Sequence, residues 1–184
     1  IYIYDFINSK WKTFELYTPT TAQGGLKSDQ ILYADALEWD NRSESIIFDQ
    51  LNRIKRGNGE DLEYWDIGIM EVWDSEKNRF GSGNIFRLSS QIPENVNIAY
   101  PSISKTTNNI LAFDYIEEID GEFYPYIVLL DIEKGDFNFF ENNSLDYSIP
   151  SFATLDNQII YTKVDQEGSS DIYSRQISDF PNDG

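Results

Sequence analysis

The stretch AYPSISKTTNNILAFDY, Ala99–Tyr115, decides the fold, because a later part of the chain repeats its pattern. The second copy is IPSFATLDNQIIYTKV, which covers Ile149–Val164 and aligns Pro150 with Pro101. Internal repeats indicate that one supersecondary unit is used several times, so they constrain the fold more than any single segment does.

A third, looser copy, ADALEWDNRSESIIFD, covers residues 34–49 and pairs Asp35 with Pro101. The three copies define two sets of equivalent residues: Leu37, Ile103 and Phe152, and Phe48, Phe113 and Tyr161. Each copy has two apolar segments around a polar turn, which is typical of two antiparallel strands. We expect both sets of equivalent residues to be buried.

A second pair of strands follows each copy. The segment around Asp131 aligns without a gap with the start of the chain, with Asp5 on Asp131 and Trp11 on Phe137. A unit of four antiparallel strands that recurs every ~40–50 residues is typical of a propeller blade.

The sequence therefore predicts an all-β fold, a β-propeller of four-stranded antiparallel blades. We expect one domain over 1–184: strands c and d of a first blade in 1–30, a second blade in 31–97, a third in 98–146 and a partial fourth in 147–184. The predicted strands lie at about 1–6, 11–17, 34–39, 45–49, 65–73, 84–88, 100–104, 109–115, 124–132, 136–141, 149–153, 158–163 and 171–177.

The YPSIS and ILAFDY segments, together with SSDIYS at 169–174, resemble the TolB-like, WD-type propeller repeat. The Ser-Pro-Asp-Gly turn usual in that family is absent. The resemblance implies a ring of six blades, of which this chain would supply three to four. It also implies a non-enzymatic, protein-binding scaffold in the periplasm or outside the cell, as part of the cell envelope.

The composition restricts both chemistry and partners. The chain has 32 acidic and 14 basic residues, a formal charge of −18, and neither histidine nor cysteine. The negative field disfavours nucleic acid and anionic membrane surfaces, whereas a protein partner or a glycan remains open. Without histidine, a Ser-His-Asp triad cannot form within the chain. We predict no membrane insertion, no cofactor and no catalytic residue. The chain begins IYIYDF without an initiator methionine, which indicates a processed protein or a piece of a longer one.

Acidic residues gather between Asp114 and Glu122, around an Asp120-Gly121 turn signal. Three interpretations stay open for this stretch: a calcium site, a glycosidase carboxylate pair, or the solvated tip of a hairpin. The segment RFGSGN at 79–84 is glycine-rich, but no helix is predicted after it and it contains no lysine. It therefore does not have the pattern of a phosphate site.

The longest connection of the second blade is predicted between Asp49 and Asp66, and it contains Arg53, Lys55, Arg56 and Tyr64 as candidate contact residues. Its basic residues have a second interpretation, which is to offset the surrounding acidic charge.

In a propeller the start of each strand a lies beside the central channel. This predicts a binding rim of Tyr33, Asp35, Tyr100 and Tyr147 next to the Arg53–Arg56 tip. Alternatively, these tyrosines turn inward and seal the channel. As alternatives to the scaffold, the chain is a propeller domain of a larger hydrolase, either a peptidase or a glycan-active enzyme, or a carbohydrate-binding module.

Overall fold

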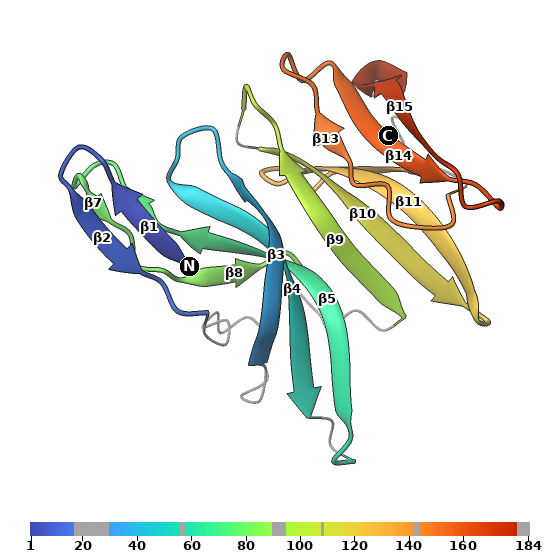
Figure 1. Cartoon of the computed structure of the whole chain (residues 1–184), viewed down its shortest axis with the longest axis horizontal. Coiled ribbons are helices and arrows are strands. Elements are labelled where there is room, and N and C mark those ends of the chain that lie inside the picture. Colours follow the sequence, from blue (N-terminus) through green and yellow to red (C-terminus); the bar gives the residue numbers. More distant parts are fainter. Residues whose placement is uncertain (17–29, 56–57, 90–94, 108, 142–143, 180–184) are drawn as a thin grey trace.

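The computed structural model describes residues 1–16, 30–55, 58–89, 95–107, 109–141 and 144–179; within these ranges the side chains of Lys55, Glu141 and Asp179 are not described. The described part is all-β, with several small antiparallel sheets and no α-helix. The sheets follow one another across the molecule in chain order, except that the short β6–β7 hairpin lies beside the β1–β2 hairpin, and none closes on itself (Figure 1). The predicted all-β class is confirmed.

Two four-stranded sheets form the centre. Counting along the chain, with the β1-β2 hairpin as the first sheet, the second sheet has the order β3-β4-β5-β8 and the third has the order β9-β10-β11-β12. Their strands are β3 (Gln30–Trp39), β4 (Ser45–Lys55), β5 (Asp61–Glu71), β8 (Ile85–Arg87), β9 (Val96–Ile103), β10 (Ile110–Ile119), β11 (Glu122–Asp131) and β12 (Phe137–Glu141). This neighbour order is that of the predicted four-stranded units.

Smaller sheets lie on either side. The hairpin β1 (Tyr2–Asp5) and β2 (Lys10–Thr13) precedes the second sheet, and β13 (Ser151–Phe152), β14 (Gln158–Val164) and β15 (Ser170–Gln176) form a fourth. A short 3-10 turn, Ile177–Asp179, follows β15. The hairpin β6 (Trp73–Asp74) and β7 (Arg79–Phe80) was not predicted. No helix in the described ranges is long and apolar enough to span a membrane.

The core lies between neighbouring sheets, in three apolar clusters. Strand alternation explains the division, because successive side chains point to opposite faces of a sheet. On β4, Ile46 and Phe48 pack toward the β1–β2 hairpin, whereas Ile47 packs toward the third sheet. On β10, Phe113 packs back toward the second sheet and Ala112 forward toward the fourth.

The predicted equivalence of the second strands is confirmed. Phe48, Phe113 and Tyr161 are all buried. On the neighbouring strands β5, β11 and β15 they pair with Gly68, Val128 and Tyr173. The second and third strands of the three sheets therefore pair in the same register.

The predicted equivalence of Leu37 with Ile103 and Phe152 is wrong by two residues. Leu37 is 49% exposed, whereas Ile103 and Phe152 are buried. Trp39 pairs with Ile46 as Ile103 pairs with Leu111, so Trp39 is the true counterpart. Both first strands have a β-bulge at the same place, so the bulges do not shift one strand against the other. The strand register places Leu37, not Asp35, on Pro101, and the lengths differ in the following turn: Phe48 comes nine residues after Trp39, whereas Phe113 comes ten after Ile103.

The predicted long connection from Asp49 to Asp66 is also wrong. Strand β4 continues to Lys55 and β5 begins at Asp61, and the two pair over their whole length. Buried Ile54 and Tyr64 alternate with the exposed pair Arg53 and Glu63, whose side chains meet at 2.6 Å. This alternation extends the strands, because one face is buried and the other carries an ion pair.

Candidate functional site

The first strands share an unusual backbone feature at equivalent places. Ala36, Tyr100 and Ile149 have positive φ angles of 44°, 52° and 50°. Such angles cost non-glycine residues about 1–3 kcal/mol each, most clearly a β-branched residue such as Ile149. Surrounding contacts must therefore hold these residues in place.

The Ala36 N–H donates to Asp35 Oδ1 at 2.9 Å, whereas Tyr100 and Ile149 are held by carboxylates of the preceding sheet. Tyr100 N–H donates to Asp49 Oδ2 at 3.1 Å, and Ile149 N–H donates to Asp114 Oδ2 at 2.7 Å. Asp49 and Asp114 occupy the same position on β4 and β10, directly after Phe48 and Phe113. The contact between the second and third sheets is thus repeated between the third and fourth.

A second hydrogen bond repeats in the same way. Ile103 N–H donates to Glu38 Oε2 at 3.0 Å, and Phe152 N–H donates to Ser102 Oγ at 3.4 Å. Glu38 and Ser102 are equivalent by strand register. Two polar contacts therefore join the third sheet to the second, and two equivalent contacts join the fourth sheet to the third.

Tyrosines and carboxylates gather around these bulges. The rings of Tyr100 and Tyr147 meet edge to face, with centroids 5.2 Å apart. The negative charge of nearby carboxylates contributes to a raised pKa of both hydroxyls. We call the group the tyrosine–aspartate cluster; it consists of Tyr33, Asp35, Asp49, Tyr100, Asp114, Asp146 and Tyr147.

Burial dominates the protonation of the cluster. It raises the pKa of Asp114 to about 7, although hydrogen bonds from the Ile149 and Ser148 N–H groups oppose the change. Burial also raises the pKa of Asp49, and burial together with nearby Asp114 raises the pKa of Tyr147 to about 12. The Tyr147 hydroxyl therefore stays protonated and can donate a hydrogen bond.

The structure brings together four of the predicted rim residues. Tyr33 is half-exposed, its hydroxyl lies 3.3 Å from Asp35 Oδ2, and its ring meets Trp65 edge to face. Asp35 contributes to the field at Tyr100, which in turn packs on Tyr147.

The other predicted contact residues differ from expectation. Arg53 lies within β4 and pairs with Glu63 rather than forming a loop tip. Tyr64 is 2% exposed, on the opposite face of the sheet, where Arg87 Nη1 donates to its hydroxyl at 2.5 Å. It cannot contact a partner there. Arg56 and the side chain of Lys55 lie outside the described residues.

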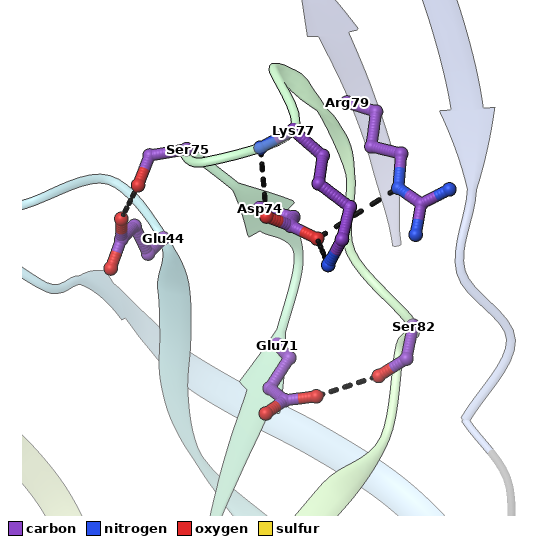
Figure 2. Close-up of polar contacts among 7 residues, drawn as sticks. All are labelled: Glu44, Glu71, Asp74, Ser75, Lys77, Arg79 and Ser82. Carbon is purple, nitrogen blue, oxygen red and sulfur yellow. Dashed lines mark hydrogen bonds and ion pairs between the residues drawn. The ribbon is translucent and has the colours of Figure 1, made fainter.

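A separate cavity of about 570 Å³ opens beside the β6–β7 hairpin, and we call it the hairpin pocket. Its lining includes three carboxylates, two cations, two serines and two aromatic rings: Glu44, Glu71, Asp74, Lys77, Arg79, Ser45, Ser82, Trp73 and Phe80. Figure 2 shows Ser75 bonded to Glu44 on one side and Ser82 bonded to Glu71 on the other. The Ser82 hydroxyl donates to Glu71 Oε2 at 2.7 Å.

Close backbone packing holds this pocket in shape. Gly81 N–H donates to Val72 O at 2.8 Å, and a Cβ on Gly81 would lie 2.9 Å from Glu71 O. At Gly83, φ is 78° and a Cβ would lie 2.7 Å from Phe14. The glycines of RFGSGN therefore allow close packing against β5 and the β1–β2 hairpin.

A second cavity, of about 810 Å³, lies between the third and fourth sheets and is lined in part by Ser104, Asp131, Lys134, Phe137 and Asp156. Asp156 joins the two sheets: its carboxylate accepts the N–H groups of Lys105 and Thr106 at 2.8 and 2.7 Å, and the Ser104 hydroxyl at 2.6 Å.

No group of three acidic side chains in the described ranges converges as a metal site would require. The acidic stretch after Asp114 forms a hairpin instead, with Ile119 paired to Glu122 and positive φ angles at Asp120 and Gly121. This is the predicted two-residue turn. Asp114 is buried at the interface with the fourth sheet and is separated from the tip.

Comparison with known proteins identifies no relative, because no family model matches the chain and a search of curated proteins finds no match.

Proposed function

We propose that the chain forms part of a β-propeller that acts as a non-enzymatic binding scaffold, with the tyrosine–aspartate cluster as its recognition surface for a protein partner. The observation that carries the proposal is the repeated aspartate bond to the bulged N–H, from Asp49 to Tyr100 and from Asp114 to Ile149. Sheets that pack repeatedly through equivalent contacts are typical of radial repeat folds.

The exposed face of the fourth sheet supports a continuing repeat. Thr162 occupies the position of Asp49 and Asp114, and Ile172 occupies that of Ile67 and Ile127. Ile67 and Ile127 are buried under the following sheet, whereas Ile172 is 77% exposed. In the propeller, a further sheet covers this face.

The cluster has the chemistry of a recognition surface. Tyr33 and Tyr147 offer rigid rings with polar ends, and Asp35 and Asp146 are exposed carboxylates beside them. Aromatic side chains serve well at interfaces because they bury a large area at modest entropic cost. The expected partner is a protein that presents basic side chains, since these complement the acidic field.

A scaffold fits the cluster better than a hydrolase site. The two buried carboxylates, Asp49 and Asp114, each hold a backbone N–H of the next sheet. With no histidine in the chain, a general base would have to come from another residue type. The TolB-like relationship and the cell-envelope location stay predictions that rest on the sequence resemblance.

Site-specific photo-crosslinking tests the proposal. A photoreactive phenylalanine analogue replaces Tyr33 or Tyr147 in the protein expressed in its own cells, and adducts are identified by mass spectrometry. Leu155, an exposed residue on the turn between β13 and β14, provides the control position. We expect the same protein to be cross-linked from Tyr33 and Tyr147 but not from Leu155.

The purified partner then allows a quantitative test. Asp35→Asn together with Asp146→Asn should slow association and weaken its dependence on salt, because exposed interfacial charges act mainly on encounter rates. Two results would refute the proposal that the cluster is a recognition surface. One is adducts from Leu155 alone, and the other is a partner whose binding is unchanged by both substitutions.

A further inference from the structure

We propose that the hairpin pocket binds a neutral sugar, a hexose or N-acetylhexosamine unit of a glycan. The pocket is distinct from the tyrosine–aspartate cluster and does not depend on ring closure. Its volume of about 570 Å³ falls within the ~300–1,000 Å³ typical of small-molecule sites. Its lining combines carboxylates, hydroxyls, cations and aromatic rings.

The charges of the pocket disfavour an anionic ligand. Lys77 Nζ lies 2.8 Å from Asp74 Oδ2, and Arg79 Nε lies 3.8 Å from the same oxygen (Figure 2). Both cations are thus paired with one carboxylate, while Glu44 and Glu71 add further negative charge to the walls. A phosphate or carboxylate ligand would meet that charge directly.

A metal ion is also disfavoured. The carboxylates of Glu44 and Glu71 point to different serines, Ser75 and Ser82, on separate sides of the pocket (Figure 2). They do not converge into a set of three ligands in the described part of the chain.

A neutral polyhydroxylated ring matches the polar groups that remain. A carboxylate accepts several hydrogen bonds, so Glu44 and Glu71 keep capacity for ligand hydroxyls after bonding their serines. Such charge-assisted bonds are stronger than neutral ones. Lys77 carries three donor hydrogens, so it can serve a ligand oxygen as well as Asp74.

The aromatic rings match the C–H faces of a sugar. Trp73 and Phe80 line the pocket and meet edge to face, with centroids 5.4 Å apart. Both side chains are half-buried, so each ring is fixed by packing and still partly accessible. An aromatic surface beside hydrogen-bonding groups suits a ligand with one apolar and several polar sides.

The site is preformed. Val72 N–H and Trp73 N–H both donate to Glu44 O, at 2.9 and 3.0 Å, which joins the hairpin to the turn before β4. Lys12 Nζ donates to Gly81 O at 2.8 Å from the β1–β2 hairpin. A ligand therefore meets groups that are already ordered, which lowers the entropic cost of binding.

Saturation-transfer NMR with the purified chain tests the proposal. The probes are the methyl glycosides of glucose, galactose, mannose and N-acetylglucosamine at millimolar concentration, with methyl phosphate and lysine methyl ester as charged comparisons whose methyl protons can be observed. We expect transfer to at least one glycoside, with enhancement at its C–H protons, and none to methyl phosphate or the lysine ester.

Variants then locate the binding. Glu71→Ala should weaken it by about tenfold, equivalent to ~1.4 kcal/mol, while Glu133→Ala, which removes the same charge from the β11–β12 turn, should leave it unchanged. Trp73→Phe, which keeps an aromatic ring, serves as a second variant if Glu71→Ala does not fold, and should alter the transfer pattern. The proposal would be overturned by transfer to none of the glycosides, by transfer to methyl phosphate or the lysine ester in their place, or by glycoside binding that these substitutions leave unchanged.

Discussion

The buried carboxylate of Asp114 makes the stability of the protein depend on pH in a direction opposite to that of most surface carboxylates. Burial raises its pKa in the folded protein to about 7, against an ordinary value of 3.8. The folded state therefore binds a proton more tightly than the unfolded state between these two values. By linkage, the free energy of unfolding falls as the pH rises from about 4 to 7, and it levels off above 7.

Asp114→Asn removes this loss. Asparagine keeps a carbonyl oxygen that can accept the Ile149 N–H, but it has no charge to bury. Each pKa unit corresponds to ~1.4 kcal/mol. The free energy of unfolding of the variant, relative to that of the natural protein, should therefore rise by ~1.4 kcal/mol per pH unit between pH 4 and 7, up to about 4 kcal/mol in total.

Urea unfolding followed by tryptophan fluorescence, at several pH values between 4 and 8, measures this difference. The comparison isolates Asp114 from Asp66, whose pKa burial raises to about 6. Asp120→Asn, at the exposed β10–β11 turn, controls for the loss of one negative charge. A difference between Asp114→Asn and the natural protein that stays constant over this range would refute the reasoning, because Asp114 would then be ionised throughout in the folded state.

Three further predictions concern the packing of the sheets. Phe113→Ala should lower the free energy of unfolding by ~3–5 kcal/mol in the same assay, since it empties part of the core between the second and third sheets; a loss below 1 kcal/mol would show that the ring is not packed there. Asp156→Ala should cost about 1–2 kcal/mol and speed amide exchange at Lys105, because it removes the bonds from Asp156 to the turn after β9; unchanged exchange would contradict this contact. Gly83→Ala should lower the melting temperature more than Gly135→Ala, because both positions have positive φ but only at Gly83 would the new Cβ meet a side chain; equal effects would show that backbone strain alone matters.

The repeated units could be predicted from sequence because each strand is an apolar run bounded by turn residues. The register of the first strands could not, because the copy at 34–49 has no proline to mark it, and Asp35 rather than Leu37 was placed on Pro101. A usable signal was present in the endings of IIFD and LAFD, where Asp49 and Asp114 close the apolar runs at equivalent places. An aspartate at that position is unusual for a buried strand and indicates a specific hydrogen-bond partner.

The two candidate sites differ in how well they could be predicted from the sequence. The grouping of Tyr33, Asp35, Tyr100 and Tyr147 could be predicted because the first strands begin at equivalent places in the repeated units. The hairpin pocket was not, since β6 and β7 have two residues each and too short a pattern to predict. The WDSEKNRF segment does carry a signal, with turn-forming residues between Trp73-Asp74 and Arg79-Phe80.

The propeller account depends most directly on the rotation that relates successive sheets. A crystal structure of the whole protein measures that rotation by superposing β3-β4-β5 on β9-β10-β11, and then β9-β10-β11 on β13-β14-β15. The account predicts two equal rotations about one axis, of about 45–90° as in rings of 4–8 blades, with a further sheet on Ile172 and Thr162. Two unequal rotations, or a fourth sheet whose outer face lies open to solvent, would contradict it.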